Sequence, residues 1–328
     1  MTVDMLIDWF ATIGNFPVLA FILAVIISGI PLFLIMALNA MIAVYVERKV
    51  SAFMMDRIGP MGQGPGLHAG KWGLLQTAAD AVKLLVKEDT IPDSSDKFLF
   101  KMAPYIIFIG AFLGLAAVPF SSTLQVADFN VGVFYIIAVG SIGVIGIVMA
   151  GWASNNKYSM IGGMRSAAQL MSYEIPLLLS MAGVFLLAGS FDPVVIVEKQ
   201  QESTWLFGLP MWNIIPQFIG FIVFMICILA EVERVPFDLP EAEAELVEGW
   251  TTEYSGIRYM LFLAAEYIRG FAGAAVATIL FLGGWAGPWP VPPEIWFLMK
   301  VYLIIIFWIF IRWTVPRLSL IHISEPTS

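Results

Sequence analysis

Long apolar runs with few or no charged side chains recur along this sequence of 328 residues and limit what it can fold into. A helix needs about 20 consecutive apolar residues to cross the ~30 Å hydrocarbon core of a bilayer. Runs of about this length lie at 17–46, 102–121, 131–151, 170–190, 213–231, 256–284 and 295–315. Apolar residues make up 59% of the chain and charged residues 13%, against about 45–50% and about 25% in soluble domains. We therefore expect an all-α polytopic membrane protein with about seven to eight transmembrane helices.

The side chains that ligate redox centres are scarce. The chain has one cysteine, Cys227, which lies in an apolar run, and two histidines, His68 and His322. One cysteine cannot form a disulfide within the chain, ligate an iron–sulfur cluster by itself or make a CxxC pair. Two histidines cannot supply several haem ligands. We therefore expect this chain to bind no metal and to carry no redox centre.

Lys and Arg are distributed unevenly between the loops that join the apolar runs. The loop 47–101 holds most of them, and the opposite loops contain only Lys199. The other basic loop residues are Lys157, Arg165, Arg234, Arg312 and Arg317. The positive-inside rule places the basic loops on the cytoplasmic or matrix side, with the N-terminus, 122–130, 191–212 and 285–294 facing outward. Because Arg48 is the first basic residue, we expect the first run to be a retained helix and not a cleaved signal.

Part of the 47–101 loop has the period of an amphipathic helix. In WGLLQTAADAVKLLVKED, one face carries Gln76, Asp80, Lys83 and Lys87. The opposite face carries Leu75, Ala79, Val82 and Val86. Such a stripe indicates a helix that lies in the membrane interface. An ordinary surface helix and a helix that docks a partner both fit this pattern.

Several charged side chains fall inside the apolar runs, where each costs about 2.5–3.5 kcal/mol at the bilayer centre. Glu174 lies beside Pro176 with no basic residue within helical reach, which favours a place along a polar cavity. Glu266 and Arg269 are three residues apart on one predicted helix. Either they have functional roles or they only neutralise each other. Lys300 lies near the outer end of the last run, where we expect its ammonium to reach the interface.

Carboxylates are concentrated in the acidic loop 231–255, which begins EVERVPFDLPEAEAELVEGW. Against the single Arg234 it holds Glu231, Glu233, Asp238, Glu241, Glu243, Glu245, Glu248 and Glu253. A solvated loop would have this charge. The apolar residues between the carboxylates, such as Phe237 and Trp250, favour a partly buried loop instead. Crowding and burial raise carboxylate pKa values and couple their titration, so the loop is suited to hold and pass protons.

A glycine-rich stretch follows the first run. The run closes with Glu47, Arg48 and Lys49, and five glycines lie between 59 and 70, after Arg57. The pattern is neither GxxxxGK[ST] nor a strand-flanked GxGxxG, which argues against nucleotide binding. A turn-rich loop over an amphipathic mouth fits a lipid-like ligand that enters from the membrane. Its soft apolar lining would be Phe53, Met54 and Met55.

Four motifs occur in a characteristic order: ERKVSAFMMDRIGP, GLLQTAADAVKLLVKED, MRSAAQLMSYEIP and AEVERVPFDLPEAEAELVEGWTTEYSG. Together they closely resemble the H subunit of bacterial NADH:quinone oxidoreductase, respiratory complex I, which is subunit 1 of the mitochondrial enzyme. The resemblance extends from about Phe21 to Arg317. The alphaproteobacterial and mitochondrial forms are the most similar in overall impression, which favours ubiquinone over menaquinone.

The resemblance implies a membrane subunit that forms the quinone entrance and part of the chamber wall. Quinone would be the substrate, while NADH, FMN and the iron–sulfur clusters would belong to partner subunits. The implied partners are the hydrophilic quinone-site subunits, the neighbouring membrane-arm subunits and phospholipid, but no nucleic acid. The implied location is the bacterial inner membrane, or the mitochondrial inner membrane for an organelle-encoded chain.

The family's functional positions can be carried over to this sequence one by one. The residues that we expect at the quinone site are Glu47, Arg48, Phe53, Arg57, Asp80, Lys83, Arg234 and Asp238. Those that we expect in proton coupling are Arg165, Glu174, Glu231, Glu241, Glu243, Glu245 and Glu266. In this interpretation quinone reduction shifts the protonation of the acidic loop, and the change passes through Glu174, Glu231 and Glu266 toward the membrane arm.

Two other functions fit parts of the pattern. The chain would also serve as the membrane anchor of a related hydrogenase or formate hydrogenlyase, where no quinone enters. A free-standing proton-coupled transporter would equally carry glutamates inside its membrane helices.

The C-terminal segment departs from the family. The family continues past the seventh run with a basic stretch and an eighth membrane helix, whereas this chain reads RWTVPRLSLIHISEPTS. We expect 1–318 to form one transmembrane domain and 319–328 to be a non-native tail on a truncated reading frame. His322 would then have no functional meaning.

Overall fold

The computed structural model describes residues 17–60, 72–202, 211–240, 242–287 and 290–318, and every regular element within these ranges is a helix. The longer helices are α2 (Pro17–Met54), α4 (Lys97–Gly114), α7 (Lys157–Ala188), α11 (Gly256–Phe281) and α12 (Pro293–Thr314). The shorter ones are η1 (Leu115–Ala117), α3 (Gln76–Val86), α5 (Gly132–Gly140), α6 (Ile142–Ala153), α8 (Pro193–Glu202), α9 (Phe218–Glu231), α10 (Glu243–Leu246) and η3 (Gly249–Thr251). The expected all-α class is confirmed. The expected tail 319–328 lies outside the described residues.

Six stretches of the described helices are long and apolar enough to cross a membrane, with α5 and α6 counted together. The structure differs from expectation at 213–231, where α9 begins only at Phe218 and has 14 residues, or about 21 Å. Pro216 gives the reason, because proline lacks an N–H group and turns the residue before it away from helical geometry. The preceding segment binds the end of α11 instead, where the Asn213 amide donates to the Leu280 carbonyl at 2.9 Å.

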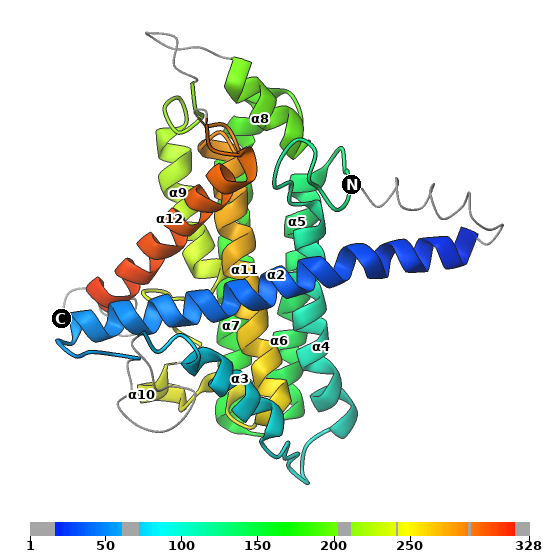
Figure 1. The fold of residues 1–328 in the computed structure, drawn as a ribbon. Coiled ribbons are helices and arrows are strands. Elements are labelled where there is room, and N and C mark those ends of the chain that lie inside the picture. Colours follow the sequence, from blue (N-terminus) through cyan, green and yellow to red (C-terminus); the bar gives the residue numbers. More distant parts are fainter. Residues whose placement is uncertain (1–16, 61–71, 203–210, 241, 288–289, 319–328) are drawn as a thin grey trace.

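Helix α11 runs through the middle of the bundle and contacts α2, α4, α9 and α12 (Figure 1). Every residue from Phe271 to Phe281 is buried. Many of these residues are small, which lets neighbouring helices approach closely. At Gly273, for example, any Cβ would collide with the Ile228 side chain of α9. Helix α2 crosses α4, α7 and α11 at a steep angle (Figure 1).

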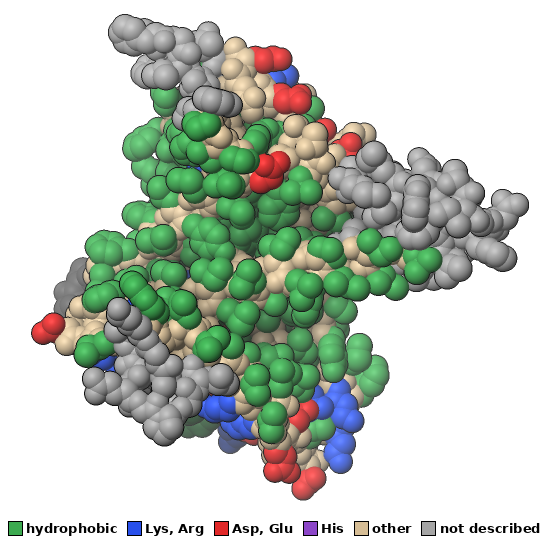
Figure 2. All heavy atoms as spheres, viewed as in Figure 1, with side chains coloured by type: hydrophobic (Ala, Val, Ile, Leu, Met, Phe, Trp, Pro, Cys, Tyr) green, Lys and Arg blue, Asp and Glu red, His purple; other side chains and the backbone are tan. Residues whose placement is uncertain are grey.

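The two ends of the bundle carry different loops. Helices α3 and α10 lie at one end and α8 lies at the other (Figure 1). Figure 2 shows apolar side chains across the middle of one face and charged side chains at its ends, with Lys and Arg mainly at the α3 end. The loop 122–130 belongs to the α8 end, because Gly132 packs against Pro193. The loops therefore separate into the two groups that the Lys and Arg count predicts.

The amphipathic helix predicted in the 47–101 loop is confirmed as α3. It joins α2 through an ion pair between Arg48 and Asp80. Thr77 is its only buried residue, while Val82 and Val86 on the apolar face are 54% and 80% exposed. This apolar face is therefore available to lipid or to a partner protein.

The ammonium of Lys300, which we expect to reach the outer interface, binds the turn that follows α11. Its ammonium donates to the carbonyls of Leu282, Gly284 and Ala286 at 2.8, 2.9 and 2.6 Å, and lies 4.6 Å from the centre of the Trp212 ring. Gly284 has a φ of 53°, a conformation that L side chains rarely adopt. The ammonium thus binds the turn after α11 and holds it against α12.

Replacing Lys300 with methionine is expected to destabilise this turn. The change keeps the length of the side chain but leaves three carbonyl groups without their donor, which costs about 1–3 kcal/mol for poorly solvated acceptors. The expected result is a lower thermal unfolding midpoint of the purified complex. Lys157→Met, at the exposed start of α7, is the matched control and should leave the midpoint unchanged. Equal midpoints for both variants would contradict the prediction.

Candidate functional site

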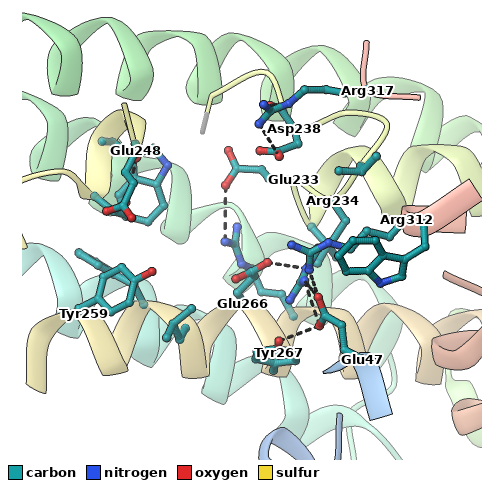
Figure 3. Close-up of a pocket in the computed structure, with 18 of the residues that line it drawn as sticks. Glu47, Glu233, Arg234, Asp238, Glu248, Tyr259, Glu266, Tyr267, Arg312 and Arg317 are labelled. Atoms are coloured by element: carbon teal, nitrogen blue, oxygen red, sulfur yellow. Dashed lines mark hydrogen bonds and ion pairs between the residues drawn. The ribbon is translucent and has the colours of Figure 1, made fainter. Parts of the chain in front are cut away.

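A cavity of about 580 Å³ lies where the C-terminal part of α2 meets α11, the end of α12 and the acidic loop. Its walls carry four arginines and five carboxylates. The arginines are Arg234, Arg269, Arg312 and Arg317, and the carboxylates are Glu47, Glu233, Asp238, Glu248 and Glu266. Figure 3 shows most of these side chains pointing toward one another from different elements. We call this cavity the charged chamber.

Glu47 lies at the centre of the strongest cluster in the charged chamber. Arg234 donates to both of its carboxylate oxygens, at 3.0 and 3.2 Å, and Tyr267 donates its hydroxyl at 2.8 Å. Arg312 from the end of α12 binds the same carboxylate (Figure 3). One side chain of α2 is therefore held by the acidic loop, α11 and α12 together.

Arg234 connects this cluster to a second carboxylate. Its Nε lies 2.5 Å from an oxygen of Glu266, and its guanidinium lies 4.8 Å from the centre of the Tyr267 ring. The side chains of Arg234, Glu47 and Glu266 are 17%, 11% and 21% exposed. Because they are largely removed from water, their mutual attraction is stronger than that of surface pairs.

Two further pairs close the charged chamber on the side of the acidic loop. Arg317 donates to the Asp238 carboxylate at 2.6 Å and to the Asp238 carbonyl at 3.2 Å. Glu233, whose side chain is 4% exposed, accepts from Ser166 of α7 and lies 3.8 Å from Arg269. Burial raises the pKa of Glu233, while the Arg269 guanidinium and the Ser166 hydroxyl oppose that shift.

A narrow apolar slot of about 60 Å³ continues from the charged chamber between α2, α11 and α12. The slot shares six lining residues with the chamber, which are Glu47, Val232, Arg234, Glu266, Tyr267 and Arg312. Its other walls are apolar, and they include Ala43, Phe271, Ile305, Trp308 and Ile309. A charged space that opens into an apolar slot suits an amphiphilic molecule with a polar head and an apolar tail.

The comparisons with known proteins decide the family. The model of the NADH dehydrogenase family matches residues 27–325. The chain is 48% identical to the H subunit of the NADH-quinone oxidoreductase of Anoxybacillus flavithermus over 301 residues, 90% of this chain and 86% of that protein. The chain belongs to this family. It is also 50% identical to the H subunit from Brevibacillus brevis over 84% of this chain and 79% of the relative, and 48% identical to the one from Geobacillus sp. over 92% and 88%.

Membership of the NADH dehydrogenase family makes the chain a membrane component of an enzyme complex, the NADH-quinone oxidoreductase. It supports a membrane subunit of NADH-quinone oxidoreductase over a hydrogenase anchor or a free-standing transporter. Within the described residues no group of three or more His, Cys, Asp or Glu side chains has the arrangement of a metal site. The names of the relatives specify a quinone without saying which one, so ubiquinone stays a prediction.

The eight residues expected at the quinone site divide into two groups. The charged chamber is lined by Glu47, Arg234 and Asp238. Outside its lining are Arg48, Phe53, Arg57, Asp80 and Lys83. In this second group, Arg48 pairs with Asp80, and Phe53 is 73% exposed. These five residues lie on the exposed end of α2, the turn after it and α3, so their role stays a prediction.

The residues expected in proton coupling are also distributed over several places. Glu266 lines the charged chamber, and Arg165 of α7 pairs with Glu245 of α10 at 2.7 Å. Glu174 and Glu231 lie deeper, along an intramembrane cavity of about 70 Å³ between α4, α5, α7, α9 and α11. Ser141, at the break between α5 and α6, donates to Glu174. Glu241 lies outside the described residues, as does the side chain of Glu243.

Sequence reasoning missed several side chains of the charged chamber. Glu233, Tyr267, Arg312 and Arg317 were not assigned to the site, although each of them lines it. Glu266 and Arg269 do not neutralise each other, because Glu266 pairs with Arg234 and Arg269 pairs with Glu233. The charge imbalance of the acidic loop was the one available signal. A loop with eight carboxylates and one arginine needs counter-charges from other segments, and Arg317, after the last run, supplies one of them to Asp238.

Proposed function

We propose that this protein forms the membrane-facing entrance and part of the wall of the quinone chamber of NADH-quinone oxidoreductase. The observation that carries the proposal is the continuity of the apolar slot with the charged chamber. In this proposal the isoprenoid tail enters along the slot between α2, α11 and α12, and the polar quinone head group lies among the arginines and carboxylates. This protein lies in the inner membrane of the cell. NADH, FMN and the iron–sulfur clusters belong to hydrophilic partner subunits that bind at the α3 end.

We further propose that the protein couples quinone reduction to proton translocation. Reduction of the head group changes the charge in the chamber, and the ion pairs of Glu47, Arg234 and Glu266 respond because they share partners. Glu174 and Glu231 in the intramembrane cavity receive the change and pass it to the neighbouring membrane subunits. Glu241, Glu243 and Glu245 of the acidic loop, together with Arg165 of α7, complete the proposed chain of charges.

Replacing Glu266 with glutamine tests this function. Glutamine keeps the shape of the side chain but cannot take up or release a proton, so quinone-linked NADH oxidation and proton pumping should both fall about tenfold or more. Oxidation of NADH by an artificial acceptor at the flavin site should persist, because it needs only assembled partner subunits. The variant is measured in membranes that carry the whole complex.

Glu198→Gln is the matched control for this test. Glu198 is exposed on α8, at the opposite end of the bundle, so its substitution should leave every activity unchanged. If Glu266→Gln pumps protons and reduces quinone at the rate of the control, the charged chamber is not part of the coupling machinery.

A further inference from the structure

Arg269 lines both the charged chamber and the intramembrane cavity. It lies on α11, nearly one turn beyond Glu266, in a position between the two spaces. On the chamber side its partner is Glu233. On the membrane side the same guanidinium shares a cavity with Glu174 and Glu231. The positive charge that acts on the chamber therefore also acts on the intramembrane carboxylates.

Arg269 is held loosely in this position. Its distance of 3.8 Å from Glu233 exceeds that of a hydrogen bond. Within the described part of the chain, the Nε of Arg269 and the Oε2 of Glu231 are both buried and have no hydrogen-bond partner. A buried guanidinium with spare donors beside a carboxylate with a spare acceptor favours a second arrangement, in which the two groups bind each other.

Glu233 is the group that can set the choice between the two arrangements. It has a φ of 57° and is held from α7 by Ser166, which is fully buried. The charged groups that act on it are Arg269 and Glu266 from α11 and Asp238 from the acidic loop. Burial and the two neighbouring carboxylates all favour its neutral form, and only Arg269 among these charged groups opposes it.

We propose that Arg269 is the charge link between the charged chamber and the intramembrane cavity, with Glu233 as its counter-ion on the chamber side. Ionised Glu233 holds the guanidinium toward the chamber. In this state Glu174 and Glu231 hold one proton between them. When Glu233 takes up a proton from the chamber, the guanidinium turns to Glu231, and its positive charge drives the shared proton off toward the membrane arm. One proton is bound and one is released, and the arginine keeps its charge throughout. This inference rests on the function proposed above and assigns its connecting residue.

The test compares three variants in membranes that carry the whole complex. Arg269→Gln removes the link, so protons pumped per NADH should fall about fivefold or more, in the range of measured couplings between sites. Arg269→Lys keeps the charge without the planar fork, and should retain part of the pumping. Glu233→Gln should remove one step from the pH profile of quinone-linked turnover, a step that lies above the ordinary range of a glutamate.

The double variant Glu233→Gln with Arg269→Gln separates a charge link from a structural pair. Neutral side chains at both positions leave no buried charge unpaired, so the complex should assemble and the flavin-site activity should persist. If pumping stays low in the double variant, the link is supported. If pumping returns to the wild-type level, the pair is merely structural and the proposal is overturned. A pH profile of Glu233→Gln identical to that of the wild type would also overturn it.

Two further variants make the result specific. Asp89→Asn weakens the partly buried pair between Asp89 and Arg258, which are 3.0 Å apart and line neither cavity, and should leave pumping unchanged. Glu266→Gln reports on the function itself. If it lowers turnover while the Arg269 variants pump normally, only the charge link fails. If neither has an effect, the proposed function fails as well.

Discussion

Replacing Arg234 with glutamine is expected to be the most damaging single substitution in the charged chamber. Arg234 binds Glu47 through both carboxylate oxygens and Glu266 through its Nε. Removing one partner from buried ion pairs costs about 3–5 kcal/mol, because the remaining charge loses its compensation. Glu47 keeps Arg312 and Tyr267, whereas the bond from Arg234 is the one ion pair found for Glu266 in the described residues. We therefore expect a lower thermal midpoint of the complex and less of this protein in the membrane.

A surface pair and a double variant make the Arg234 prediction falsifiable. Arg48→Gln breaks a pair whose side chains are 44% and 36% exposed, so its effect on stability should be below about 1 kcal/mol. Adding Glu266→Gln to Arg234→Gln should recover part of the loss, because the unpaired carboxylate is then neutral. Similar midpoints for Arg48→Gln and Arg234→Gln would show that the chamber ion pairs do not stabilise the fold.

Substitution of Gly162 with alanine is expected to displace the acidic loop. Gly162 of α7 faces the backbone of η3, and a Cβ there would lie 2.7 Å from the Cα of Gly249 and 2.7 Å from the nitrogen of Trp250. Backbone atoms cannot rotate away as side chains do, so α7 and η3 must move apart. The cost is about 3 kcal/mol, the upper end of the usual range for overpacking. Because Glu233 and Arg234 lie on the same loop, quinone-linked turnover should fall together with stability.

Gly143→Ala is the matched control for the Gly162 prediction. A Cβ at Gly143 of α6 meets nothing within 4 Å, and alanine favours a helix over glycine by about 0.5–1 kcal/mol. This control should leave the stability of the complex unchanged or slightly increased. Wild-type stability and turnover in Gly162→Ala would mean that the loop tolerates the separation and is not held closely by α7.

Most of the helices follow from local features of the sequence. The apolar runs, the amphipathic period of α3 and the glycine and proline positions act over a few residues, so they can be recognised without the fold. The shortened α9 shows where this reasoning stops. Its apolar run is long enough for a span, but Pro216 and the bonds of Asn213 to the end of α11 remove its first turns from the helix.

Tertiary structure decided which charges meet in the charged chamber. Glu47 and Arg234 are 187 residues apart, and Glu47 and Arg312 are 265 residues apart, so no periodicity along the chain relates them. Arg269 illustrates the same point, because its neighbour on the helix, Glu266, is not its partner. The packing of the helices brings distant arginines to the carboxylates, and this pairing offsets the cost of removing each charge from water.

The sequence by itself determined that this chain is a helical membrane protein, that its basic residues gather on one side and that its acidic loop is not a simple solvated segment. These properties depend on hydrophobicity and charge, which each residue carries wherever it lies. Only the tertiary structure decided that an apolar slot continues into the charged chamber and that Arg269 lies between two cavities. A cavity is the space that several elements leave between them, and its shape depends on how those elements pack.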